Sequence, residues 1–334
     1  MITILILGFI FSAVLQFAYL NKYDVISGLA TRENFAVAKA ILVSIGVGMI
    51  LLNVEIAMGF ASYHVKPFVL GGIILGGSIF GIGMAILGYC PGTLAISAGE
   101  GSIDAIIGII GGILGGITYT ILLPYISPII GPDLGKISLA SLLGNHNILF
   151  FIIVIIIGIL FVYSAYLLHK QDKDKNNKWL YSGIALAILN IVVFSSFVTN
   201  RPIGASTSYP YVGDLLTGLT NNAYFQKIAT PGNWEVIFLF GAFLGGFIIS
   251  LFRKDFNVIL LHKNWIKYKG ESPMKRVIWA FVGGFILVFG ARMAGGCTSG
   301  HILSGGMQFA ISSLVFAIFV AIGLLVTGKI FYKS

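Results

Sequence analysis

The sequence predicts an all-α integral membrane protein, and three observations carry the prediction. Of the 334 residues, 57% are hydrophobic and only 10% are charged, with a mean hydropathy of +0.96. A soluble domain of this length would lack the polar side chains needed to cover its surface. The other two observations are a series of long apolar stretches and two similar glycine-rich turns, each containing one of the chain's two cysteines.

The apolar stretches predict about nine transmembrane helices, because a helix needs about 20 mainly apolar residues to cross about 30 Å of hydrocarbon. The stretches lie near 2–20, 35–60, 68–89, 102–123, 147–169, 179–198, 235–252, 274–296 and 309–331. A β-barrel would show short alternating strands, and the unbroken apolar run 153–159 does not alternate. The first stretch lacks both a preceding basic residue and a small-residue cleavage site, so we expect a retained span rather than a signal peptide. No appended soluble domain is expected.

The net charge of +9 is interpreted as a topology signal and not as a nucleic-acid-binding surface. Basic residues gather after the fifth and seventh predicted spans, beside the first loop and at the C-terminal tail. They are Lys170, Lys173, Lys175, Lys178, Arg253, Lys254, Lys263, Lys267, Lys269, Lys275, Arg276, Lys22, Arg32, Lys39, Lys329 and Lys333. Because basic loops stay in the cytoplasm, we expect these residues to be solvated there, with the N-terminus outside and the C-terminus inside a cell inner membrane. Only Lys66, Lys136, Arg201 and Lys227 fall on the opposite side, and Arg292 falls within the eighth span.

The two cysteine turns resemble each other in sequence. The first reads Gly88-Tyr89-Cys90-Pro91-Gly92-Thr93 and the second Gly295-Gly296-Cys297-Thr298-Ser299-Gly300-His301. After the cysteines the match continues without a gap, since Ser97 and Gly99 correspond to Ser304 and Gly306. Each turn follows one long apolar segment and precedes another, which indicates an internal repeat.

The predicted topology makes the two copies inverted repeats. An odd number of crossings separates the cysteine turns, so they approach the membrane from opposite faces. We place the copies at about 1–123 and 179–334, joined by a connecting span at about 147–169, within a single transmembrane domain over 1–334. The segments 90–100 and 297–307 are too short to span and too apolar for exposed loops, so we expect short re-entrant helices. Such helices build a substrate site near the bilayer midplane.

The residue types at these turns suit a soft anion. A thiol is polarizable, and the N-terminus of a helix offers unpaired N–H groups with partial positive charge. Arg292, in an otherwise uncharged segment, is a candidate for long-range attraction, although it would equally serve to hold helices together through a carbonyl or a distant acid. The candidate substrate-binding residues are Cys90, Cys297, Pro91, Gly92, Thr93, Thr298, Ser299, Gly300, His301 and Arg292.

Three further expectations concern the surroundings of the site. His301 lies four residues after Cys297, but two ligands make a poor metal site, so a packed histidine is the better interpretation and no metal or cofactor is expected. Asp104 is expected to act as a helix cap. The region 199–234 is expected to hold a turn and a short helix near 213–219 that lines an outer vestibule.

The two cysteine turns, with the run 291–301, resemble the two signature blocks of the YeeE/YedE sulfur-transport family, and the shared layout covers nearly the whole chain. The resemblance implies an inverted-repeat membrane protein that takes up thiosulfate, passes it between cysteine thiols through S–H to sulfur hydrogen bonds, and works with a small TusA-like sulfur carrier in the cytoplasm. It places the central cysteine of the family at Cys90 and the second-half cysteine at Cys297. Family members that carry thiosulfate have another cysteine shortly after the first span, whereas residues 21–28 contain none.

Three classes of function remain open at this point. The preferred one is an uptake transporter for a small sulfur-containing anion, which is not an enzyme. A transporter or channel for another soft solute, such as a polysulfide or selenium compound, would share the architecture. A membrane thiol oxidoreductase would need a resolving thiol or a cofactor motif, and neither is evident.

Overall fold

The computed structural model describes residues 1–144, 147–172 and 175–333, and the regular structure within these ranges is helical apart from isolated β-bridges. In chain order the helices are α1 (Ile2–Phe17), α2 (Tyr23–Ala30), α3 (Ala36–Ala57), α4 (Leu70–Leu87), α5 (Pro91–Gly99), α6 (Ile103–Ile130), α7 (Leu139–Leu143), α8 (Ile148–Gln171), α9 (Lys178–Phe194), α10 (Ser208–Thr217), α11 (Ala223–Phe252), α12 (Lys263–Lys269), α13 (Pro273–Met293), the π-helix η1 (Thr298–Gly305) and α14 (Ile311–Phe331). The prediction of an all-helical membrane protein is confirmed.

Seven segments of the described chain are long and apolar enough to cross a membrane. They are α3, the α4–α5 segment, α6, α8, α11, α13 and α14. Two further predicted spans correspond to α1 and α9, which are apolar but only 16 and 17 residues long. The count of nine spans therefore stays a prediction.

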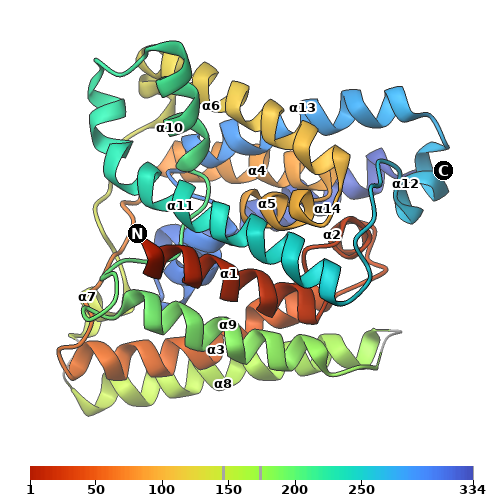
Figure 1. Cartoon of the computed structure of the whole chain (residues 1–334). Coiled ribbons are helices and arrows are strands. Elements are labelled where there is room, and N and C mark those ends of the chain that lie inside the picture. Colours follow the sequence, from red (N-terminus) through yellow and green to blue (C-terminus); the bar gives the residue numbers. More distant parts are fainter. Residues whose placement is uncertain (145–146, 173–174, 334) are drawn as a thin grey trace.

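The long helices run side by side, with the N- and C-termini at opposite ends of the bundle (Figure 1). We name the end that carries Met1 and α7 the N-terminal face, and the end that carries α12 and Tyr332 the C-terminal face. Helix α13 packs against α6 and α4, α14 packs against α4, and α1 packs against α11. Helix α3 packs against α8 and α9, and α8 is the least buried of the seven candidate spans, with a row of exposed aliphatic side chains.

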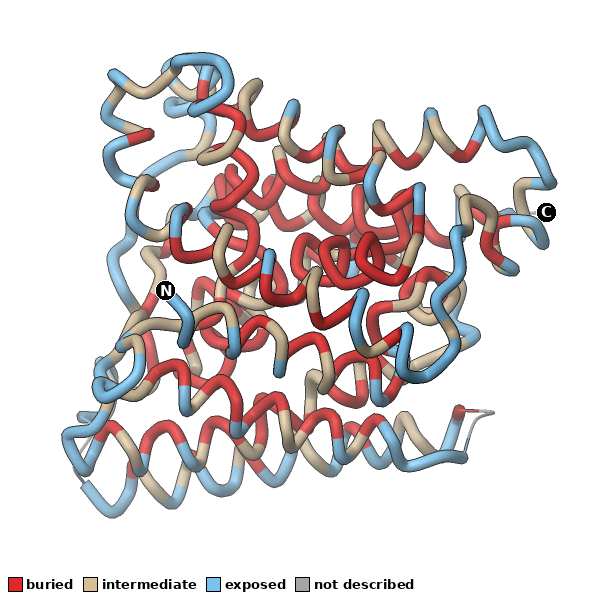
Figure 2. Tube along the Cα trace, in the orientation of Figure 1, coloured by how far each residue is buried: buried red, intermediate tan, exposed pale blue. Residues whose placement is uncertain are grey.

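Glycines allow the closest helix crossings. An added Cβ at Gly284 of α13 would collide with the carbonyl oxygen of Gly108 on α6, and one at Gly8 of α1 would collide with the carbonyl oxygen of Phe238 on α11. Small residues at such crossings let the helix backbones approach closely. In a bilayer the hydrophobic effect does not drive helices together, so this close van der Waals packing stabilises the bundle. The buried residues gather in the middle of the bundle as a result (Figure 2).

Two charges of the C-terminal face correct the sequence interpretation. Arg276 and Lys39 were predicted to be solvated topology signals, but the side chain of Arg276 is fully buried and that of Lys39 is 1% exposed. Arg276 pairs with Asp104 of α6 and also donates to the carbonyl oxygens of Ile86 and Leu87. Asp104 is thus an ion-pair partner and not only a helix cap. Burying a charge is costly unless the charge is paired or hydrogen-bonded within the protein.

Candidate functional site

The Cys90 turn forms where α4 ends in the middle of the bundle. Gly88 has a positive φ of 78°, a conformation that glycine adopts without strain, and it stops α4 after Leu87. Cys90 is then extended and caps α5, whose first residue is Pro91. Proline suits this position because the first N–H of a helix has no partner within the helix. All nine residues of α5 are buried.

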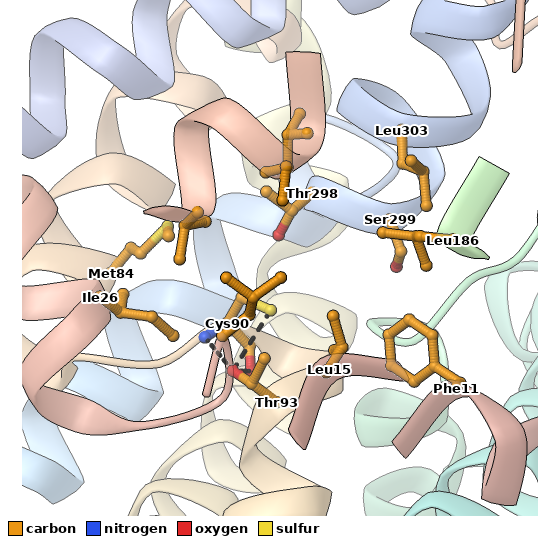
Figure 3. Close-up of a pocket in the computed structure, with 14 residues that line it drawn as sticks. Phe11, Leu15, Ile26, Met84, Cys90, Thr93, Leu186, Thr298, Ser299 and Leu303 are labelled. Atoms are coloured by element: carbon orange, nitrogen blue, oxygen red, sulfur yellow. Dashed lines mark hydrogen bonds between the residues drawn. The ribbon is translucent and has the colours of Figure 1, made fainter. Parts of the chain in front are cut away.

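Thr93 holds the Cys90 turn closed. Its hydroxyl oxygen accepts a hydrogen bond of 2.9 Å from the backbone N–H of Cys90. The same hydroxyl lies 3.1 Å from the Cys90 carbonyl oxygen and 3.4 Å from the Cys90 sulfur, and it can donate to either (Figure 3). The sulfur is therefore fixed in place by its own helix, with its other side turned toward a cavity.

The Cys297 turn has the same design in the other half of the chain. Helix α13 ends at Met293, Gly295 has a positive φ of 74°, and Cys297 is the extended residue before η1. The Cys297 sulfur lies 3.2 Å from the Ser299 hydroxyl oxygen, within hydrogen-bonding distance. Both cysteines are free thiols.

The two turns meet at one small cavity of about 70 Å³. Cys90 and Thr93 line it from the first turn, and Thr298 and Ser299 line it from the second (Figure 3). The rest of the wall is apolar and consists of Phe11, Leu15, Leu20, Ile26, Val37, Ala40, Ile41, Met84, Leu186 and Leu303. The Cys297 sulfur is not part of this wall. Four of the candidate substrate-binding residues predicted from the sequence, two from each half of the chain, therefore line the same cavity.

A third turn, residues 203–209, lies against both cysteine turns, whereas the sequence predicted a turn in the region 199–234 only as part of an outer vestibule. The Tyr209 hydroxyl donates a hydrogen bond of 2.9 Å to the Pro91 carbonyl oxygen. On the other side, Ser304 of η1 donates to the Ile203 carbonyl oxygen at 3.4 Å. The sequence predicted a short helix near 213–219, whereas α10 begins at Ser208 and its N-terminal end reaches the interior. The polar run 206–208 indicates the turn, but it does not show that the turn reaches the cysteine turns.

Arg292 is held by hydroxyl groups. It is 7% exposed, and its guanidinium donates to Tyr224 at 2.8 Å, to Thr207 at 3.1 Å and to Ser206 at 3.3 Å. No carboxylate in the described ranges lies within ion-pairing distance of it. The alternative that Arg292 pairs with an acid therefore does not match its described surroundings, and its positive charge stays uncompensated by direct contact.

Arg292 also lines a cavity of about 720 Å³ on the side of the N-terminal face. Lys66, Lys136 and Lys227 line the same cavity, so three of the four basic residues that the sequence assigned to the less basic side converge there. Lys66 donates a hydrogen bond of 2.7 Å to the carbonyl oxygen of Gly295, the first residue of the Cys297 turn. Burial, together with the nearby positive charge of Arg292, lowers the pKa of Lys66.

The remaining candidates have supporting positions. Gly92 packs near Phe11, and Gly300 packs near the Lys66 side chain. His301 is fully buried, with one ring nitrogen 3.0 Å from the Ser313 hydroxyl and the other 2.9 Å from the Ala294 carbonyl oxygen. Both ring nitrogens are thus occupied within the protein, as expected of a packed histidine. No group of three His, Cys, Asp or Glu side chains suited to a metal ion occurs in the described part of the chain.

Comparison with known proteins agrees with these motifs. A family model described as sulphur transport matches residues 23–326. The chain belongs to this sulfur-transport family. It is 25% identical over 335 residues to the thiosulfate transporter TsuA of Spirochaeta thermophila, covering 96% of this chain and 95% of that protein. It is 23% identical over 315 residues to the thiosulfate transporter TsuA of Escherichia coli, covering 88% and 84%.

A shorter match is closer in sequence. The probable transporter YedE of Escherichia coli is 34% identical over 96 residues, which cover 28% of this chain and 24% of that protein. The family is one of transport proteins and not of enzymes, as the turns and apolar helices predicted.

Proposed function

We propose that this protein is an inner-membrane uptake transporter for a small sulfur-containing anion, with thiosulfate as the first candidate. The observation that carries the proposal is the meeting of the Cys90 thiol with Thr298 and Ser299 at one cavity of about 70 Å³. This volume has room for a solute of only a few heavy atoms. A polarizable thiol beside hydroxyl donors suits a solute with one soft sulfur end and one oxyanion end. Both long relatives carry the name of thiosulfate transporters.

The cavity lined by Lys66 and Arg292 supports an entry route. Several cations around one concave site raise the local concentration of anions and steer them inward. Because Arg292 has no acid against it in the described structure, its charge is available to an arriving anion. The anion would then pass the Cys297 turn, which Lys66 contacts through Gly295, and reach Cys90.

The order of helices supports two inverted repeats. In the first half α1 to α6 have lengths of 16, 8, 22, 18, 9 and 28 residues, and in the second half α9, α10, α11, α13, η1 and α14 have 17, 10, 30, 21, 8 and 21. In this correspondence α1 matches α9, α3 matches α11, α4 matches α13 and α6 matches α14. The packing of α1 on α11 is then equivalent to the packing of α9 on α3. The packing of α4 on α14 is likewise equivalent to the packing of α13 on α6. Helices α1 and α9 run in opposite directions. Helix α8 would be the connecting span.

This arrangement leads to a nine-span topology within one domain. The repeats would cover about 1–123 and 179–334, with the N-terminal face outside and the basic C-terminal face in the cytoplasm. α5 and η1 would be re-entrant helices whose N-terminal ends point at the midplane, adding N–H donors to the site. A TusA-like sulfur carrier would dock at the cytoplasmic face and receive the sulfur species.

Each candidate residue has a role in this proposal. Cys90 makes the central contact with the sulfur end of the anion, assisted by Thr93, Thr298 and Ser299. Cys297 makes a second contact on the way to it. Pro91, Gly92 and Gly300 shape the two turns, His301 braces the second one, and Arg292 attracts the anion.

A second candidate is a transporter of a softer solute, such as a polysulfide or a selenium compound. Ten of the fourteen residues that line the central cavity are apolar, and Ile26 of α2 lines it near the position where thiosulfate-carrying family members have a further cysteine. An apolar wall raises the cost of stripping water from the anion, which favours a softer and more weakly hydrated solute. The two candidates differ only in the solute.

Uptake into proteoliposomes of purified protein tests the proposal and separates the candidates. Radiolabelled thiosulfate should enter wild-type vesicles, and unlabelled thiosulfate should compete better than sulfate, sulfite, selenite or tetrasulfide. Cys90→Ala should abolish uptake, whereas Ser164→Ala on the exposed surface of α8 serves as a matched control. Stronger competition by tetrasulfide or selenite would favour the second candidate. Equal uptake by Cys90→Ala and wild type would reject the thiol site.

A further inference from the structure

A second polar cavity lies behind the cysteine cavity, toward the C-terminal face. Its volume is about 180 Å³, and it is enclosed by the end of α1, the beginning of α3 and the beginning of α9. The polar side chains in its wall include Lys39, Lys178, Asp172 and Asn34. Lys39 was interpreted from the sequence as a loop charge, and no motif pointed to a cavity beside it.

The two cavities share a wall made by α2 and α3. Ile26 of α2 and Val37 and Ala40 of α3 line the cysteine cavity. Their immediate neighbours Val25, Ala36 and Lys39 line the polar cavity. The same turns of α2 and α3 therefore face both spaces, and the residues that they turn toward Cys90 are apolar.

Lys39 presents a buried cation to the polar cavity. Its ammonium is 2.8 Å from an Asp172 carboxylate oxygen and 3.4 Å from a ring nitrogen of His169, and it lies 5.0 Å from the centre of the Trp179 ring. A buried ion pair contributes little net stability compared with apolar side chains of the same size, so its presence calls for another explanation. Lys178, which is exposed, adds a second positive charge, so among the described residues that line the cavity two lysines face one carboxylate.

We propose that this cavity is the release site, where the transported sulfur anion leaves the cysteine cavity and binds to Lys39 before it enters the cytoplasm. The inference rests on the proposed function. An ammonium group can donate three hydrogen bonds, so Lys39 can exchange its longer contact with His169 for an anion oxygen while it stays paired with Asp172. The anion crosses the shared wall when Ile26 moves away from Val37 and Ala40.

Three measurements on purified protein test this proposal: uptake by proteoliposomes, thermal unfolding, and protection of Cys90 by thiosulfate from a small alkylating reagent, read by mass spectrometry of the Cys90 peptide. The decisive variant combines Lys39→Met with Asp172→Asn, which removes both charges and changes the side-chain volumes little. The Phe35 N–H donates a hydrogen bond to the Asp172 carboxylate, and the amide oxygen of the substituted asparagine can still accept it. We expect this variant to unfold at the wild-type temperature and to keep Cys90 protection, but to lose uptake by about tenfold or more, as expected for one charged hydrogen bond. Lys39→Arg, which retains the charge, should keep most of the uptake.

A second pair of variants tests the cavity without changing a charge. Ala36→Phe would fill the polar cavity and should lower uptake while Cys90 stays protected, whereas Ala38→Phe on the same helix does not line the cavity and should not. Wild-type uptake by the Lys39→Met/Asp172→Asn variant would overturn the release site and leave the proposed function intact. If thiosulfate and the competing solutes neither entered wild-type vesicles nor protected Cys90, the proposed function itself would fail.

Discussion

The Tyr209 hydroxyl donates a hydrogen bond to the Pro91 carbonyl oxygen at 2.9 Å, and this contact joins residues that are 118 positions apart. It connects the N-terminal end of α10 to the first residue of α5, directly after Cys90. The Cys90 turn is therefore positioned both by its own Thr93 and by a helix from the second half of the chain. A site built from three turns in this way depends on contacts that lie outside the cysteine motifs.

Tyr209→Phe should remove this contact and leave the packing intact. One neutral hydrogen bond contributes about 1 kcal/mol, so we expect roughly a fivefold fall in uptake with a small drop in thermal stability. Initial rates in proteoliposomes and thermal unfolding measure the two effects. Tyr163→Phe, at an exposed position of α8, is the matched control. An unchanged rate for Tyr209→Phe would mean that α10 does not position the Cys90 turn.

The two thiols should differ in importance. Cys90 lines the central cavity and the Cys297 sulfur does not, so Cys90→Ala should abolish uptake and Cys297→Ala should leave partial activity. Cys90→Ser should fail nearly as badly as Cys90→Ala, because a hydroxyl lacks the polarizable sulfur. Uptake of labelled thiosulfate at matched expression compares the three variants. A ranking in which Cys297→Ala is the most damaging would reverse the order of the two contacts.

Arg292 should act through both its charge and its shape. Arg292→Gln should raise the KM for thiosulfate, because an uncompensated cation is lost from the large cavity. Arg292→Lys keeps the charge but cannot bridge Tyr224, Ser206 and Thr207 at once, so we expect an intermediate KM. Kinetics at low and high salt separate the two contributions, since attraction at a distance weakens with salt. A lower maximal rate at unchanged KM in Arg292→Gln would indicate a structural role only.

Uptake should decline at alkaline external pH because of Lys66. Its pKa is lowered from the ordinary value of 10.5, so Lys66 loses its charge at a lower pH than an exposed lysine. The loss of a cation from the entry cavity should reduce anion uptake as the pH rises from neutral to about 10. Lys66→Arg, whose side chain stays charged, should show a weaker decline. Parallel pH profiles for the two proteins would exclude Lys66 as the titrating group.

A cysteine in α2 should not be required for transport. Ile26 is 1% exposed and lines the central cavity, so Ile26→Cys adds a thiol at the inner end of the site. We expect wild-type protein to take up thiosulfate and the variant to remain within about twofold, since a Cys side chain is smaller and similarly apolar. Ile26→Val is the control for the loss of volume. An inactive wild type that gained thiosulfate uptake with Ile26→Cys would identify a different natural substrate for this chain.

The short helices show which parts of the fold can be predicted from neighbouring residues alone. The sequence predicted short helices over 90–100 and 297–307, and the structure has α5 and η1 there. Gly88 and Gly295 end the preceding helices through positive φ angles, and Pro91 begins α5, so a few adjacent residues were sufficient. The prediction for 213–219 was displaced, because α10 begins at Ser208, where contacts with Pro91 and Glu235 hold it.

By itself, the sequence determined that this chain is a helical membrane protein of the sulfur-transport family with two related cysteine turns. Hydropathy, glycine and proline act over a few neighbouring residues, so their effects can be read along the chain. Only the tertiary structure decided that Lys39 and Arg276 are buried ion-pair partners, that Lys66 and Arg292 share one cavity, and that the turn at 203–209 completes the site. These relationships join residues 101 to 226 positions apart, and a lysine that is solvated in a loop has the same sequence signature as one that is buried against a carboxylate.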